Sequence, residues 1–135
     1  MSELIHAGAI PFRRSAGRWE FLLVTSKRGN WIFPKGIVEL GDSTEETAER
    51  ECAEEAGVHG TVVPGLVGIY DDQKWQRPCR VYMFLLRYDS EVEWEESDIR
   101  RRGWFAYDDA LDRLRKPELR SILEFAQRRV ETLEE

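Results

Sequence analysis

Cysteine and histidine are scarce in this 135-residue sequence. The two cysteines, Cys52 and Cys79, are too few for a disulfide framework and have no metal-binding spacing. His6 and His59 likewise have no His or Cys partner close by in the sequence. We therefore expect no Cys/His metal site. Cys52 is predicted to fill space in the core, and both histidines are predicted to lie on strands.

Long apolar runs, internal repeats and Pro/Gly/Ser-rich linkers are also missing. No hydrophobic stretch approaches the roughly 18 residues of a membrane span. The N-terminal MSELIHAGAI has an acidic residue where a signal peptide would carry Lys or Arg. With 41% hydrophobic and 34% charged residues, the sequence predicts one globular domain over residues 1–135, cytoplasmic and without membrane contact.

The sequence also lacks an excess of positive charge. A net charge of −6 argues against broad nucleic-acid binding through a basic surface. The charge is nevertheless polarised, because residues 42–55 hold seven acids against one base, whereas residues 100–102 are three arginines. Such a pattern suits a metal ion that carries a polyanion. Taken singly, most of these side chains are equally compatible with a solvated surface.

The apolar periodicity predicts several strands mixed with two or three helices. We expect strands at 5–12, 19–25, 30–34, 61–70, 80–88 and 104–106, and loops at 35–42, 71–79 and 89–103. A helical apolar pattern begins after Asp108 and is interrupted by Pro117. This order favours an α/β fold, an α/β/α sandwich around a mixed β-sheet.

Residues 43–56 are predicted to form a helix with well-defined ends. Ser43 and Glu46 form an S-x-x-E capping box at its start, and Gly57 suits the left-handed residue after its end. Three small side chains repeat at intervals of four, so this face can press against a sheet. They are Ala48, Cys52 and Ala56.

The other feature of this helix is its glutamates. Glu51, Glu54 and Glu55 stand at i, i+3 and i+4, within about 100° of one helix face. Like charges at this spacing destabilise a helix by about 0.2–0.5 kcal/mol per pair. A hard divalent cation bound by carboxylate oxygens would relieve this repulsion, and Mg²⁺ or Mn²⁺ suits such ligands. Glutamate-rich helices are also common as purely soluble surface.

The longer pattern is more specific. Residues 36–58, GIVELGDSTEETAERECAEEAGV, resemble the Nudix box G-x₅-E-x₇-R-E-U-x-E-E-x-G-U, in which U is a bulky apolar residue. Gly36 opens the match, and Arg50 to Val58 follow in register. One position departs, because Asp42 stands where the family has its first Glu.

The resemblance implies a Nudix fold and metal-dependent hydrolysis of a nucleoside diphosphate linked to another group. It implies Mg²⁺, with Mn²⁺ as a possible substitute, as the cofactor that activates water and neutralises charge on the departing phosphate. By position, Glu51 and Glu55 are the main metal ligands and Glu54 a further ligand or the base that orients water. The carbonyl of Lys35 or Gly36 would add a backbone ligand, and Arg50 would hold the glutamates by ion pairing.

Outside the box, four stretches resemble the diphosphoinositol polyphosphate and diadenosine polyphosphate hydrolase branch over roughly residues 7–123: CAEEAGVHGTVVPGLVGIYDD, RVYMFLL, VEWEESDIRRRGWF and DALDRL. In that branch basic residues grip a small, highly charged polyphosphate. The matching positions are Arg28, Arg77, Arg80, Arg100 and Lys116, each of which could instead be a solvated surface charge. Because the chain begins almost directly at its first strand, we expect a diadenosine polyphosphate rather than an inositol pyrophosphate.

Other substrates fit the same pattern, namely an RNA 5′ end, ADP-ribose or an oxidised nucleoside triphosphate. A different class of protein, a catalytically silent nucleotide sensor, is favoured only by Asp42.

The tryptophans are expected in two kinds of place. Trp31 and Trp104 are expected in the core, whereas Trp75 lies in a polar stretch where it could stack on an adenine. The sequence sets no oligomeric state.

Overall fold

The computed structural model describes residues 3–133. The strands are β1 (Leu4–Ser15), β2 (Arg18–Thr25), β3 (Trp31–Ile32), β4 (Lys35–Ile37), β5 (Val58–Lys74), β6 (Arg77–Glu91) and β7 (Arg102–Ala106). The helices are α1 (Thr44–Ala56), a 3₁₀ turn η1 (Glu95–Asp98), α2 (Tyr107–Arg113) and α3 (Pro117–Leu133).

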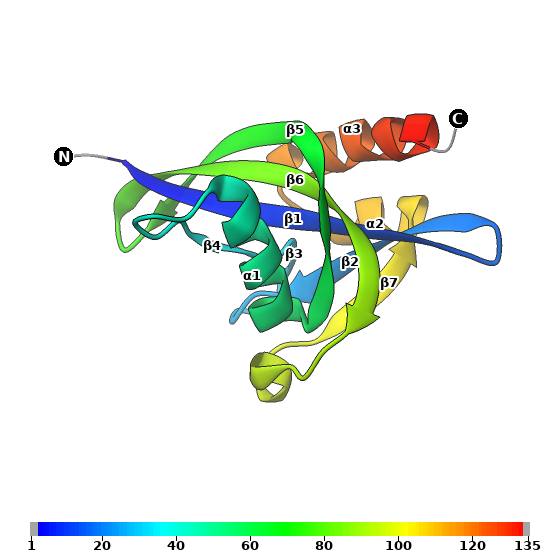
Figure 1. Ribbon diagram of the computed structural model, residues 1–135, viewed down its shortest axis with the longest axis horizontal. Coiled ribbons are helices and arrows are strands. Elements are labelled where there is room, and N and C mark those ends of the chain that lie inside the picture. The colour runs from blue at the N-terminus through cyan, green and yellow to red at the C-terminus, as the bar shows by residue number, and fades with distance from the viewer. Residues whose placement is uncertain (1–2, 134–135) are drawn as a thin grey trace.

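The strands form one mixed sheet, with α1 on one side and α3 on the other (Figure 1). Its main path runs β3-β2-β1-β6-β5, while β4 adds to β1 and β7 to β2. The central pair β1–β6 is parallel and the other pairs are antiparallel. Among residues 3–133, no helix is long and apolar enough to cross a membrane.

Each face of the sheet has its own hydrophobic core, because side chains alternate along a strand. Ala7 and Ala9 of β1 belong to the core under α1. Ile10 and Phe12 belong to the core covered by α2 and α3. The face of α1 that meets the sheet consists of small, fully buried side chains, Ala48, Cys52 and Ala56. The α/β/α layering predicted from the sequence is confirmed.

The ends of α1 also follow the prediction. The Ser43 hydroxyl accepts a hydrogen bond from the Glu46 N–H at 3.0 Å, and the Glu46 carboxylate accepts one from the Ser43 N–H at 3.0 Å. Gly57 ends the helix in the left-handed conformation (φ 66°) and donates to the Ala53 carbonyl. These interactions are local in sequence, which is why a short motif could predict them.

Three predicted loops are only partly right. The first, 35–42, begins with strand β4, whose residues Lys35–Ile37 pair with β1. The second, 71–79, is a continuous hairpin in which Lys74 pairs with Arg77 across a two-residue turn. In the third, 89–103, β6 runs on to Glu91, η1 follows, and β7 starts at Arg102. The strands in the first and third segments depend on pairing partners that are distant in sequence, and local composition does not specify such partners. The second segment pairs within its own hairpin, across a turn with an unusual sequence.

The turn of the β5–β6 hairpin has an unusual sequence. Trp75 and Gln76 both have positive φ, 53° and 62°. Two-residue turns of this kind normally contain Asn and Gly, and a larger L-residue costs roughly 1–2 kcal/mol in the left-handed conformation. The missing Gly explains why the sequence did not predict a turn here.

The histidine and cysteine predictions hold within the described residues. His6 lies on β1 and His59 on β5. Cys52 is fully buried in α1. His6 is buried too, and both of its ring nitrogens lack a hydrogen-bond partner. Burial, followed by the nearby Lys35 and Lys74 ammonium groups, lowers the pKa of His6 to about 4, so the ring is neutral at pH 7.

Candidate active site

Two glutamates of α1, Glu51 and Glu55, contact strand β4. The Glu55 carboxylate accepts a hydrogen bond from the Lys35 N–H at 3.0 Å. The Glu51 carboxylate lies directly against Gly36 and occupies the space that a Cβ atom would need there. Any side chain at position 36 would therefore displace Glu51. The side chains of Glu51 and Glu55 are 14% and 16% exposed, whereas Glu54 is 53% exposed.

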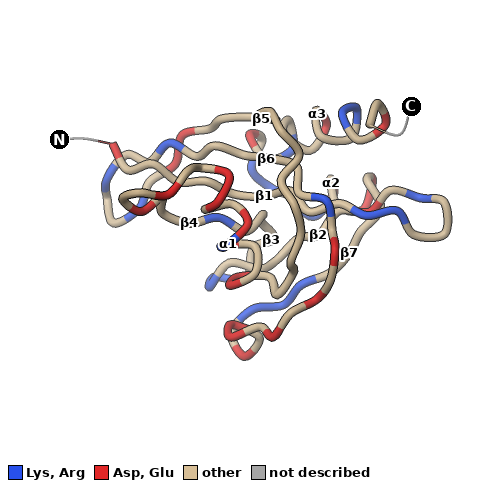
Figure 2. The backbone as a smooth tube through the Cα atoms, viewed as in Figure 1, with Lys and Arg blue, Asp and Glu red and all other residues tan. Residues whose placement is uncertain are grey.

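The glutamates of α1 form a cluster of negative charge in which ionisation is disfavoured. Burial, then repulsion by Glu55 and Glu54, raises the pKa of Glu51 to about 7. Burial also raises the pKa of Glu55, although the Lys35 N–H and the Arg100 guanidinium oppose this rise. Without a cation, the ionised cluster is unfavourable. Figure 2 shows acidic residues recurring along α1.

This donor set fits a hard divalent cation. The ligands available are carboxylate oxygens, with backbone carbonyls of β4 beside them. Among the described residues, no group of three or more Asp, Glu, His or Cys side chains is placed so that these side chains alone could hold a metal ion. Mg²⁺ is commonly held by one or two carboxylates, with waters and substrate phosphates completing its shell, so an open cluster suits it.

Arg50 holds this cluster from its outer side. Its guanidinium lies 2.5 Å from Asp42, 3.6 Å from Glu51 and 4.0 Å from Glu54. It also donates to the Ile37 carbonyl at 3.3 Å. The contacts agree with the ion-pairing role expected for Arg50, and they give Asp42 a role as well. Asp42 anchors Arg50, and the shorter side chain reaches the guanidinium without difficulty.

Arg100 lies on the other side of the cluster, and its contacts differ from those of an open phosphate ligand. Its side chain is only 8% exposed. It donates to Glu96 at 2.6 Å and to the Thr25 carbonyl at 2.8 Å, and lies 3.5 Å from Glu55. The Thr25 N–H donates to the Arg101 carbonyl at 2.9 Å, and the Arg101 N–H donates to the Thr25 hydroxyl at 2.8 Å, which fixes this segment. Arg100 thus contacts the carboxylate end of the site.

A pocket of about 610 Å³ is connected to the glutamates through Lys35 of β4. Lys35 is the link, because its backbone N–H binds Glu55 while its side chain lines the pocket. The one acid in the lining, Asp72, lies 3.7 Å from the Lys35 ammonium and 3.6 Å from that of Lys116. Six lining side chains are basic: Lys27, Arg28, Lys35, Lys74, Arg115 and Lys116. Such a pocket attracts a polyanion.

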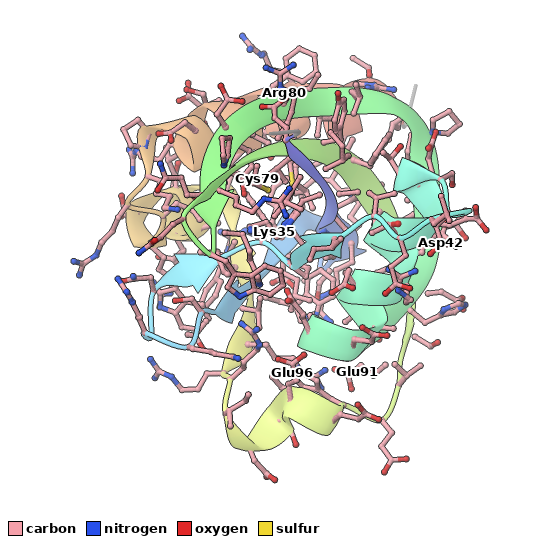
Figure 3. All side chains as sticks on the ribbon, turned by 90° about the vertical axis from the view of Figure 1, so that its left-hand side faces the viewer. Lys35, Asp42, Cys79, Arg80, Glu91 and Glu96 are labelled. Atoms are coloured by element: carbon pink, nitrogen blue, oxygen red, sulfur yellow. The ribbon has the colours of Figure 1, made fainter. Side chains whose placement is uncertain are left out.

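The five basic residues expected to grip substrate are not all in this pocket. Arg28 and Lys116 line it. Arg77 lies opposite Lys74 in the hairpin, and Arg100 lies behind Glu55. Arg80 is 3.4 Å from Asp71 and 4.0 Å from Glu3, and Figure 3 shows it at the opposite edge of this face from Glu96, with Lys35 between them.

Sequence reasoning missed four basic residues of the pocket: Lys27, Lys74, Arg115 and the side chain of Lys35. Lys74 belongs to a continuous part of the lining, residues 72–75, at the end of the β5–β6 hairpin. It could have been found only if 71–74 had been recognised as strand.

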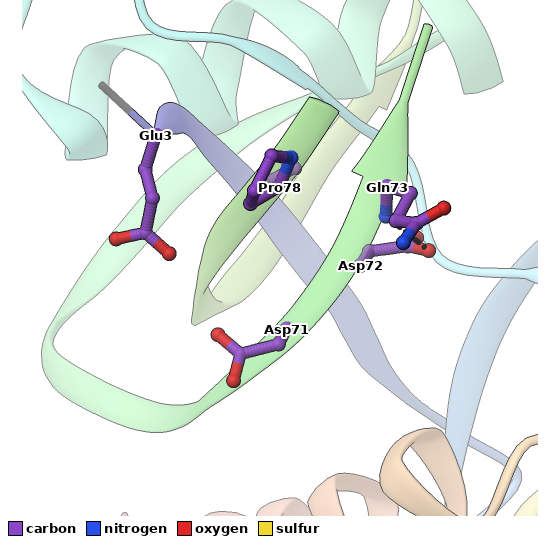
Figure 4. Close-up of a pocket in the computed structure, with 6 residues that line it drawn as sticks. Glu3, Asp71, Asp72, Gln73 and Pro78 are labelled. Carbon is purple, nitrogen blue, oxygen red and sulfur yellow. Dashed lines mark hydrogen bonds between the residues drawn. The ribbon is translucent and has the colours of Figure 1, made fainter. Parts of the chain in front are cut away.

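A second hollow lies beside the start of β1 and the β5–β6 hairpin (Figure 4). Its lining includes Glu3, Asp71 and Asp72, together with Gln73, Pro78 and Cys79. No basic side chain lines it among the described residues. Its charge disfavours phosphate, so the basic pocket is the better candidate for a polyphosphate.

Comparison with known proteins agrees with this geometry. The family model of the NUDIX domain matches residues 3–125. Nudix hydrolase 18, mitochondrial, from Arabidopsis thaliana is 34% identical over 137 residues, covering 93% of this chain and 77% of that protein. Diphosphoinositol polyphosphate phosphohydrolase 3-alpha from Mus musculus is 39% identical over 103 residues, which cover 73% of this chain and 62% of the mouse protein.

Among solved structures, a C. elegans Ap4A hydrolase binary complex superposes with a TM-score of 0.84. It covers 96% of this chain and 98% of that chain at 24% identity, which shows a shared fold. The family model and the relatives identify a hydrolase that acts on pyrophosphate substrates. The chain belongs to the Nudix family, whose hydrolases generally use a divalent metal ion.

Proposed function

We propose that this protein hydrolyses a phosphoanhydride bond in a nucleoside-diphosphate-linked or polyphosphorylated substrate, preferably a diadenosine polyphosphate, with Mg²⁺ as its metal and Mn²⁺ as a substitute. The observation that carries this proposal is the junction at Lys35. One residue contacts Glu55 through its backbone and lines the basic pocket through its side chain. A phosphate chain bound in the pocket would then lie beside Lys35, the residue whose backbone contacts Glu55.

Each part of the site has a proposed role. Glu51 and Glu55, with the carbonyl of Lys35 or Gly36, hold the metal, and Arg50 keeps the glutamates in position. Arg28 and Lys116, together with Lys35, bind the phosphate chain. When bound, the metal ion supplies positive charge against the phosphate oxygens and assists deprotonation of water. Arg77 and Arg80 stay predicted substrate residues. Arg100 was also predicted to bind substrate, but its contacts with Glu55 and Glu96 favour a role at the carboxylates instead.

Glu54 is the favoured base. It is the most exposed of the three glutamates, so water can approach its carboxylate. The water oxygen forms the new bond to phosphorus, and Glu54 accepts the proton. The bond from phosphorus to the bridging oxygen breaks, and its electron pair stays on the departing phosphate. The lysines of the pocket stabilise the charge on that phosphate.

One alternative substrate has a specific observation in its favour. The mouse relative is by name a diphosphoinositol polyphosphate phosphohydrolase, and the six basic side chains of the pocket would also attract an inositol pyrophosphate. We propose a cytoplasmic location, whereas the Arabidopsis relative is by name mitochondrial.

A substrate panel tests the proposal. Pure protein with Mg²⁺ is incubated with diadenosine polyphosphates, inositol pyrophosphate, ADP-ribose and triphosphate-ended RNA, and the products are identified. We expect diadenosine polyphosphates to be cleaved with the highest kcat/KM, and Glu55→Gln to abolish cleavage. A higher kcat/KM for another substrate would overturn the substrate assignment. Binding without cleavage of any substrate would support the sensor alternative.

A further inference from the structure

The tip of the β5–β6 hairpin presents an exposed tryptophan to the basic pocket. Trp75 is 71% exposed, yet it lines the pocket together with Lys74 and Arg28. It occupies the first position of the two-residue turn with a positive φ of 53°. An unfavourable backbone conformation is retained where the surrounding structure or function requires it, and such residues are frequent at ligand sites.

The other tryptophans are engaged elsewhere. Trp19 packs edge-on against Phe12, and Trp104 against Tyr88. Trp94 donates its indole N–H to the Glu55 carbonyl at 2.7 Å. Trp31, the other tryptophan of the pocket, packs against Phe105, and two arginine side chains lie over its ring.

Trp75 differs because its ring has a face directed to solvent. Its ring contact is the Lys74 ammonium, 5.3 Å from the ring centroid. A cation beside an exposed indole is suited to a ligand that combines an aromatic ring with negative charge, since the ring stacks on the indole and the phosphate pairs with the cation.

From this geometry we infer that Trp75 is a stacking platform for the heterocyclic base of a nucleotide whose phosphates lie in the basic pocket. This rests on the proposed function and deepens it. Binding of the base at Trp75 and of phosphates at Lys35 and Lys116 would place the phosphate chain on the path to Glu55. An inositol pyrophosphate or an inorganic polyphosphate has no ring to stack, so Trp75 would contribute nothing to its affinity.

The test compares ATP with inorganic tripolyphosphate, which has the same chain of phosphates without the nucleoside. Dissociation constants are measured by calorimetry in EDTA, where no turnover occurs, for the wild type and Trp75→Asn. Stacking of one base contributes about 5- to 150-fold in affinity. We expect Trp75→Asn to weaken the affinity for ATP by a factor in this range. The affinity for tripolyphosphate should fall by less than about twofold.

Three controls exclude a structural explanation. Trp75→Asn should keep or raise Tm, because Asn is favoured at this turn position. Trp75→Tyr retains an aromatic face and should restore most of the ATP affinity. Phe125→Ala removes another exposed aromatic side chain, on α3 and outside the pocket lining, and should change neither affinity.

Three results would overturn the stacking platform. Trp75→Asn could weaken the affinity for both ligands equally, or it could leave the ATP affinity unchanged. The wild type could also bind ATP and tripolyphosphate with equal affinity. These outcomes are independent of turnover. A protein that binds ATP through Trp75 but cleaves nothing in the substrate panel would keep this inference and refute the proposed enzyme. If the protein cleaves diadenosine polyphosphates but its ATP affinity is unchanged in Trp75→Asn, the proposed function stands and this inference is refuted.

Discussion

The two halves of the site are encoded in different ways. The carboxylate half comes from one helix and the strand before it, within residues 35–55. The basic half is assembled from segments around Arg28, Asp72 and Lys116, which lie far apart in the sequence. We propose that the chemistry is carried by the contiguous motif, and that the choice of substrate depends on how the β5–β6 hairpin and the segment before α3 come together. The two halves should respond differently to mutation.

The largest effect is expected at the carboxylate half. Glu55→Gln should lower kcat by more than about a hundredfold, or about 2.7 kcal/mol of barrier, because it removes a charge required at the metal. The substitution preserves shape, so the fold should persist. Since burial disfavours the charge of Glu55, Tm without metal should not fall. Glu45→Gln, on an exposed position of the same helix, is the matched control. Near wild-type turnover of Glu55→Gln at saturating Mg²⁺ would refute the ligand assignment.

The pH dependence of stability tests the carboxylate half without involving the basic pocket. The pKa of Glu51 is raised from 4.5 to about 7, so the folded state binds this proton more tightly than the unfolded state. Metal-free protein should therefore lose stability as pH rises from about 4.5 to about 7, by on the order of 3 kcal/mol from this residue. Denaturant unfolding in EDTA at pH 5 and pH 8 measures the loss. Glu51→Gln should reduce it, and an identical pH dependence in wild type and Glu51→Gln would contradict the raised pKa of Glu51 as its cause.

Substitution of Arg100 tests whether this residue acts with the carboxylate half or with the basic half. Its contacts with Glu55 and Glu96 place it at the carboxylate half. Arg100→Ala should then lower kcat by about tenfold, or about 1.4 kcal/mol, and change KM equally for short and long substrates. As a phosphate ligand it would instead raise KM most for long substrates and leave kcat nearly unchanged. Steady-state kinetics decides between these, with Arg100→Lys as the variant that should recover part of kcat.

The smallest effect is expected at Asp42. Because Asp42 pairs with Arg50 and the glutamates supply the metal ligands, Asp42→Glu should change kcat/KM by less than about tenfold. A gain of several hundredfold would mean that Asp42 marks a degraded enzyme, and would favour the sensor. Turnover of the best substrate in the panel is the measurement.

The same contrast explains what the sequence could predict. Helix α1 was predictable because Ser43, Glu46 and Gly57 define its ends through local hydrogen bonds. The strand character of 35–37 and 71–74 was not, because it depends on pairing with β1 and β6. Arg100 illustrates the same limit. Its burial follows from contact with Thr25, 75 residues away, and no spacing rule anticipates that contact.

The measurement that tests the joined site most directly is KM for diadenosine polyphosphates with three to six phosphates, in wild type and Lys116→Ala. If the basic pocket continues from the glutamates through Lys35, KM should fall as phosphates are added, and added salt should weaken this trend because it screens exposed phosphate contacts. Lys116→Ala should flatten the series and leave kcat nearly unchanged. Equal KM values across the wild-type series, with no effect of Lys116→Ala, would contradict a polyphosphate site that spans both halves.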